Sequence, residues 1–75
     1  MNNNRRKEIQ KAQKIINNAM ILLENILEEE EEAFDNMPEG LQFSDNGVAS
    51  EEAQDILNDA IGALEEAIGC LEEIG

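Results

Sequence analysis

The chain contains no histidine, tryptophan or tyrosine, and its 75 residues include one cysteine, one proline and two phenylalanines. Without histidine, a Ser-His-Asp or Cys-His nucleophile cannot be assembled, and a lone cysteine forms neither an internal disulfide nor a zinc finger. No apolar run approaches the roughly 18 residues that a membrane-spanning helix needs. These absences argue against an enzyme, a metalloprotein and a transmembrane protein.

The charge is strongly one-sided, with 18 acidic and five basic residues and a net charge of -13. Nucleic acids and anionic membranes repel such a chain, so we expect it to bind neither directly. All five cations, Arg5, Arg6, Lys7, Lys11 and Lys14, stand in the first 14 residues. Because an amphipathic pattern follows them instead of a continuous apolar core, we expect no secretory signal and predict a cytoplasmic location.

Apolar residues recur with helical spacing in two segments, which predicts an all-α fold with one helix at about 5–34 and another at about 50–74. In the first segment we place Ile9, Ile16 and Leu23 in one row facing the partner helix. The adjacent row of that predicted seam contains Ala12, Ala19, Ile26 and Ala33.

The second segment repeats every seven residues. Leu57, Leu64 and Leu71 form one row, and Ala53, Ala60, Ala67 and Ile74 form the next. Ser50 is the predicted N-cap, with an earlier start near Ser44 as the alternative. Cys70 is interpreted as a small core residue.

The predicted loop, residues 35–49, contains turn signals at Met37-Pro38 and at two glycines. Leu41 and Phe43 are expected to fold back and close one end of the helix pair. A loop of this length reverses the chain easily, so we predict an antiparallel helical hairpin forming a single domain, 1–75.

The apolar stripe on each predicted helix is wider than a two-helix contact requires. We therefore predict a homodimer, in which two hairpins pair into a four-helix bundle, or a hairpin that docks on a larger partner. The residues assigned to self-association are Ile56, Leu57, Ile61, Leu64, Ile68 and Leu71.

Gly62 and Gly69 lie seven residues apart on the face opposite this stripe. They indicate either a tolerant surface or close approach by another backbone. The cations at the start of the first helix are explained by pairing with the acids at the end of the second helix.

A run of five acids ends the first helix, where the helix dipole favours cations. One interpretation is a solvated end that maintains solubility; the other is an anionic surface for a basic protein groove. The residues assigned to partner binding are Glu24, Glu28, Glu29, Glu30, Glu31, Glu32, Asp35 and Glu39.

A metal site is not predicted from these acids. A calcium loop starting at Asp35 would require oxygen ligands at its third and twelfth positions, where the chain has Met37 and Asn46, so the match fails. Di-iron bundles of the usual kind require histidine. We expect no cofactor and no catalytic residue.

Residues 31–42, EEAFDNMPEGLQ, together with the glutamate-rich heptads after Ser50, resemble a group of small acidic helical proteins of Firmicutes phages and mobile elements. The resemblance covers most of the chain from Arg5 onward. It implies a genomic context and brings no known activity and no functional residues.

Two functions therefore compete. The first is a phage or mobile-element binding protein that occupies a basic surface of a nucleic-acid-binding or defence protein, as an inhibitor and in one form as a DNA mimic. The second is a structural or assembly protein whose apolar stripe mediates self-association while its acids only solvate it.

Overall fold

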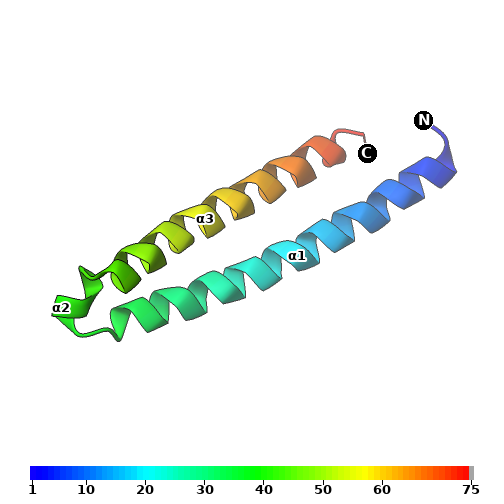
Figure 1. Ribbon diagram of the computed structural model, residues 1–75. Helices are drawn as coiled ribbons and strands as arrows, with labels where there is room; N and C mark the ends of the chain where they lie inside the picture. The colour runs from blue at the N-terminus through cyan, green and yellow to red at the C-terminus, as the bar shows by residue number, and fades with distance from the viewer. Residues whose placement is uncertain (75) are drawn as a thin grey trace.

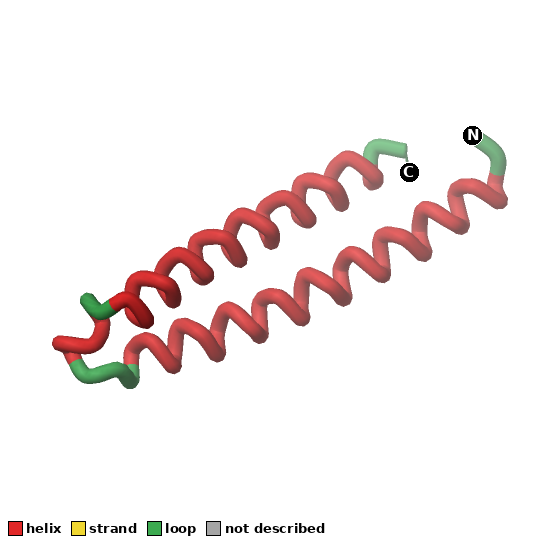
Figure 2. The backbone as a smooth tube through the Cα atoms, in the orientation of Figure 1, coloured by secondary structure: helices red, strands yellow, loops and turns green. Residues whose placement is uncertain are grey.

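In the computed structural model, which describes residues 1–74, the chain forms α1 (Asn3–Asp35), α2 (Glu39–Gln42) and α3 (Asp45–Glu72). Figure 1 shows α1 and α3 side by side in opposite directions, with α2 at the turn that joins them. The backbone tube in Figure 2 contains only helices and loops over these described residues. The predicted all-α antiparallel hairpin is confirmed.

α1 is slightly longer than the predicted helix because each end has a local backbone partner. The Asn2 side chain accepts a hydrogen bond from the Arg5 backbone N–H at 2.8 Å, which caps the first turn. No glycine or proline interrupts the following residues. At the far end the Asn36 N–H donates to the Glu32 carbonyl at 3.0 Å, and the approaching Pro38 disfavours further helix.

The turn is closed by a side chain other than those predicted. Gln42 is half-buried, and its Nε2 donates to the carbonyl oxygens of Phe34 at 3.1 Å and Met37 at 3.4 Å. Leu41 and Phe43 remain 55% and 81% exposed, so the prediction that they close the hairpin is wrong. Gln42 thereby ties the turn to the end of α1. It shares the Phe34 carbonyl with the Met37 N–H, which also donates to that oxygen at 3.0 Å, and an apolar side chain has no donor for this role.

α3 starts at Asp45, near the earlier of the two starts considered. The Ser44 hydroxyl accepts from the Gly47 N–H at 3.4 Å and is the N-cap. Ser50 lies inside the helix instead, only 5% exposed. Its assignment as the cap is therefore wrong, because Ser44 offers the same chemistry six residues earlier.

The contact between α1 and α3, which we call the inner seam, follows a spacing of three and four residues on each helix. On α1 its members are Ile9, Gln13, Ile16, Met20, Leu23, Leu27, Glu30 and Phe34, all half-buried or buried. On α3 they are Ser50, Gln54, Leu57, Ile61, Leu64, Ile68 and Leu71. One predicted row on each helix is confirmed: Ile9, Ile16 and Leu23 on α1, and the leucines on α3. In the second predicted row of α3, Ala53, Ala60 and Ala67 are half-buried beside the seam, and Ile74 is exposed.

The second predicted row of α1 is in the wrong place. Ala12 is half-buried, but Ala19, Ile26 and Ala33 are exposed, and the positions one residue further on, Met20 and Leu27 among them, turn toward α3. Cys70 is also exposed and is not a core residue. Larger side chains remove more apolar area from water than alanine does, so the row that contains Met20 and Leu27 packs against α3.

The hairpin by itself has little interior. Among the described residues only Leu27 and Ile61 are buried apolar side chains. The surface is 5713 Å², whereas a compact monomer of this mass exposes about 4,600 Å². The radius of gyration is 17.1 Å, against about 11 Å for a globular chain of this length. A single hairpin thus leaves roughly 1,100 Å² of additional surface in water.

Candidate interaction surfaces

Folding divides the charge between the two ends of the hairpin. We call residues 1–23 and 60–74 the open half and residues 24–59 the loop half. The open half has five cations and five acids, Glu8, Glu65, Glu66, Glu72 and Glu73, so its formal charge is zero. The loop half has the remaining 13 acids and no cation, and therefore the whole net charge of the protein.

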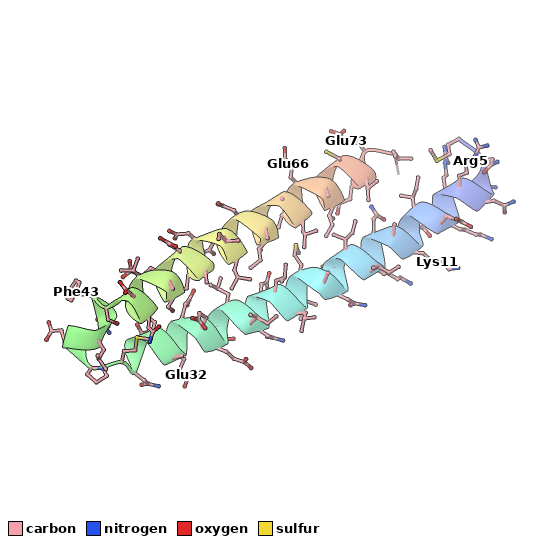
Figure 3. The ribbon with its side chains drawn as sticks, in the orientation of Figure 1. Arg5, Lys11, Glu32, Phe43, Glu66 and Glu73 are labelled. Atoms are coloured by element: carbon pink, nitrogen blue, oxygen red, sulfur yellow. The ribbon has the colours of Figure 1, made fainter. Side chains whose placement is uncertain are left out.

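Figure 3 makes this division visible. Arg5 and Lys11 lie at the open end of α1, opposite the end of α3 where Glu66 and Glu73 lie, and Glu32 lies near the turn. The basic start of α1 therefore lies at the same end of the hairpin as the acidic end of α3. The acids of the loop half have no cation on their own half.

The acids assigned to partner binding do not share one surface. Because each residue of an α-helix turns about 100°, five in succession surround the axis. Seven of the eight are exposed, namely Glu24, Glu28, Glu29, Glu31, Glu32, Asp35 and Glu39. The eighth, Glu30, is half-buried in the inner seam, where its Oε1 accepts a hydrogen bond from the Ser50 hydroxyl at 2.7 Å.

The residues assigned to self-association divide differently. Five of them belong to the inner seam and contact the chain's own α1: Leu57, Ile61, Leu64, Ile68 and Leu71. Only Ile56, 66% exposed, is available to another molecule. The structure places the remaining exposed apolar side chains elsewhere on the two helices.

A second apolar row follows each helix, and we call the two rows together the second face. On α1 it contains Ala12, Ile15, Ala19, Leu22, Ile26 and Ala33, with Glu29 as its one acid. Along α3 it contains Ala49, Ala53, Ile56, Ala60, Ala63, Ala67 and Cys70, again spaced by three and four, and Ile74 follows just beyond the helix end. Ala53, Ala60 and Ala67 are half-buried where this row borders the inner seam. The larger members are well exposed, at 68% for Ile15 and 60% for Leu22.

Both rows lie on one side of the hairpin. On each helix the second row is rotated by about 100° from the inner seam, in the same sense when viewed from that helix's own N-terminus. Since α1 and α3 are antiparallel, equal rotations in the same sense bring the two rows to a common side. The result is a continuous apolar surface along both helices. In the sequence, the second row of each helix can be separated from the inner seam by its side-chain sizes, because it contains more alanine.

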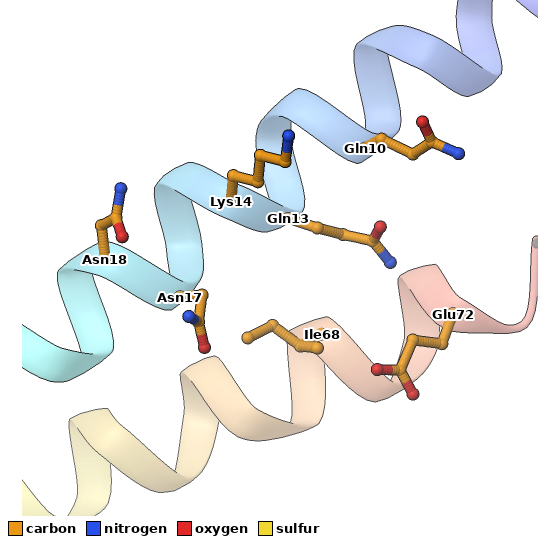
Figure 4. A pocket seen from close by; sticks show the side chains of 7 residues that line it. All are labelled: Gln10, Gln13, Lys14, Asn17, Asn18, Ile68 and Glu72. Carbon is orange, nitrogen blue, oxygen red and sulfur yellow. The ribbon is translucent and has the colours of Figure 1, made fainter.

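A shallow polar groove lies between the open ends of α1 and α3, with a volume of about 490 Å³ (Figure 4). It is lined by Gln10, Gln13, Lys14, Asn17, Asn18, Ile68 and Glu72. The side-chain amides of its glutamines and asparagines can form hydrogen bonds, but the groove is open to solvent and has no cluster of like charges. It has none of the enclosure that small-molecule sites show.

Within residues 1–74, no group of three or more potential ligating side chains is placed to hold a metal ion. No helix in this part of the chain is both long enough and apolar enough to cross a bilayer. Comparison with protein-family models, with curated proteins and with solved structures found no match.

Proposed function

We propose that the protein is a helical assembly module in which second faces pair two hairpins into a four-helix bundle. The observation that supports this most directly is the second face itself, a two-helix apolar surface whose larger side chains the hairpin leaves in water. Such a face has the spacing that helix packing requires. Its burial would remove the additional surface that distinguishes this chain from a compact monomer.

The size of the face is sufficient for a stable interface. One of the four long sides of the hairpin amounts to roughly a quarter of the 5713 Å² surface, or about 1,400 Å². Stable complexes bury about 800 Å² on each partner. Pairing therefore needs only part of the side that carries the two apolar rows.

Adjacent residues of α1 provide a matched test. Leu22 lies on the second face and Ile21 on the far side, at 60% and 49% exposure. Leu22→Gln removes an apolar side chain from the interface twice per dimer, and we expect the dissociation constant to rise about 100-fold. Ile21→Gln should leave it within about threefold of the unchanged chain. Sedimentation equilibrium measures both, and an equal response of the two variants would contradict the proposal.

A second candidate function follows from the division of charge. The loop half, with 13 acids and no cation, is suited to a basic surface of a nucleic-acid-binding or defence protein. The chain would then act as an inhibitor, and in one form as a DNA mimic. The wrapping of the acids around α1 favours a cationic cleft that encloses the helix end over a flat surface.

This candidate is tested by neutralising acids without changing the fold. Glu28, Glu29, Glu31 and Glu32 are replaced together by Gln, and Glu30 is retained because it bonds Ser50. We expect helicity and self-association to persist while capture of a basic partner weakens at least about tenfold. Four matched Gln replacements in the open half, at Glu65, Glu66, Glu72 and Glu73, are the control. Equal capture by the two variants would eliminate the acidic run as the binding surface.

A further inference from the structure

We infer that the occupant of the second face is a second copy of this chain in the antiparallel orientation, with the two turns at opposite ends of the bundle and Lys11 opposite Glu32 of the second copy. The inference rests on the proposed self-association and adds its orientation and register. In this arrangement α1 packs on α1 of the second copy, and α3 on α3.

The division of charge selects this orientation. Packed helices are about 8–10 Å apart, close to the Debye length of about 8 Å at physiological ionic strength, so facing segments dominate. In the antiparallel pair, the α1 segment of the open half, with five cations and one acid, faces residues 24–39 of the second copy, with eight acids. In the parallel pair, those eight acids face the five acids of residues 45–59 instead.

Repulsion between the acids of the two α3 helices disfavours the antiparallel pair, but it does not reverse the preference for that orientation. In the antiparallel pair the four acids of the open half of α3 face the five acids of the loop half of its copy. The attraction along α1 involves the larger charges, five cations against eight acids. The parallel pair also has an attractive contact, between the open ends, but it collects both loop halves and all 26 of their acids at one end.

The edge of the second face fixes the register. Along its outer edge on α1 lie residues seven positions apart: Asn4, Lys11, Asn18, Asn25 and Glu32. When two α1 helices run past each other in opposite directions, centred near Met20 and Ile21, Lys11 comes opposite Glu32 and Asn18 opposite Asn25. The stripe is thus complementary to its own reversed copy, as a two-fold interface requires.

The apolar residues agree with the same register. Ala19 then lies opposite Leu22, and Ile15 opposite Ile26. An alanine meets a leucine at the centre, and two isoleucines meet on each side. Alternation of this kind lets two helices approach without leaving voids.

Orientation is measured by placing one spin label at the turn. Gly40 is suitable because a Cβ built there meets no heavy atom within 4 Å outside its own helix, and Cys70→Ala removes the native thiol while keeping an apolar side chain on the second face. With Gly40→Cys labelled, we expect the two labels of a dimer to lie roughly 55 Å apart by double electron–electron resonance. A parallel dimer would give less than about 20 Å and would overturn this inference while leaving the proposed self-association intact.

Register is measured by mixing two charge variants, Lys11→Glu and Glu32→Lys. In the antiparallel pair, the mixed dimer restores both Lys–Glu contacts, whereas each homodimer places like charges together. In an equimolar mixture, we expect the ratio of mixed dimers to homodimers to exceed its statistical value about fivefold by native mass spectrometry with one variant isotopically labelled. In a parallel pair each variant residue faces unchanged α3, so mixing would be statistical and the inference would fail.

A third outcome separates the proposals themselves. If the unchanged chain stays monomeric up to millimolar concentration, both the self-association and this orientation are wrong. The face would then belong to a different helical protein. If the chain dimerises and Leu22→Gln prevents it, the label distance alone decides the orientation.

Discussion

The glycines of α3 show how much the surroundings of a single residue decide. Gly47 is buried, and a Cβ there would overlap the backbone of Gln42. Backbone cannot move aside as a flexible side chain can. Gly62 and Gly69 have nothing within 4 Å of the same position, so the close approach considered for them has no counterpart within the hairpin.

We predict opposite effects for alanine at these sites. Gly47→Ala should lower the free energy of unfolding by about 1–3 kcal/mol, because the turn must shift to admit the methyl group. Gly62→Ala should raise it by about 0.5–1 kcal/mol, because alanine loses less conformational freedom in a helix. Urea titration followed by circular dichroism measures both. A stabilising Gly47→Ala would mean that the turn packs differently.

Ser50 and Glu30 are a second case in which position outweighs residue type. By type, Ser50 is a helix cap and Glu30 is one of five equivalent acids. In the hairpin they meet across the inner seam, and Gln54 Nε2 also donates to the Ser50 hydroxyl at 3.3 Å. This polar group lies among apolar rows, so Glu30 is matched to a partner whereas its neighbours in the run face water.

At the scale of the helices, the two apolar rows of each helix make different contacts. The inner seam holds α1 against α3, and the second face is free in the single hairpin. We predict that Leu27→Ala, at 9% exposure, lowers the free energy of unfolding by about 2–3 kcal/mol.

The control for that substitution is Ile21→Ala on the far side of α1. It should change stability by less than about 0.5 kcal/mol, since its side chain is already half in water. Thermal unfolding at low micromolar concentration, where association contributes least, measures the difference. Comparable losses in the two variants would mean that the seam has been assigned to the wrong rows.

The sequence predicts the helices and their antiparallel arrangement because apolar spacing, capping residues and turn residues all agree. It does not distinguish the two rows on α1, since Ala19 and Met20 both lie within an apolar stripe and only the competition for area decides between them. The prediction that Leu41 and Phe43 close the turn is wrong because apolarity does not indicate which side chain will donate hydrogen bonds to the carbonyl oxygens of the turn. The candidate acids were named from adjacency in sequence, and a helix distributes adjacent residues around its axis.

For the whole molecule, the large net charge means that salt should change the strength of self-association. A dimer has a formal charge of -26 from two chains of -13, so its overall repulsion is screened as salt rises. We predict that self-association strengthens about threefold to tenfold between 0.05 and 0.5 M sodium chloride.

Binding of the loop half to a basic partner should show the opposite trend and weaken over the same range. Sedimentation equilibrium measures the first response, and capture on a cationic protein the second. Self-association that weakens with salt would show that attraction between opposite charges, and not the apolar face, holds the dimer together.

The hairpin measures 58 × 15 × 13 Å, and its entire net charge sits toward one tip. A rod with this asymmetry turns tip-first in the field of a cationic body and arrives end-on, presenting only its narrow cross-section. Two copies packed side by side with their turns at opposite ends would bear such a pole at each extremity. The assembly would then be a bivalent strut, able to hold two cationic bodies apart at the length of the bundle.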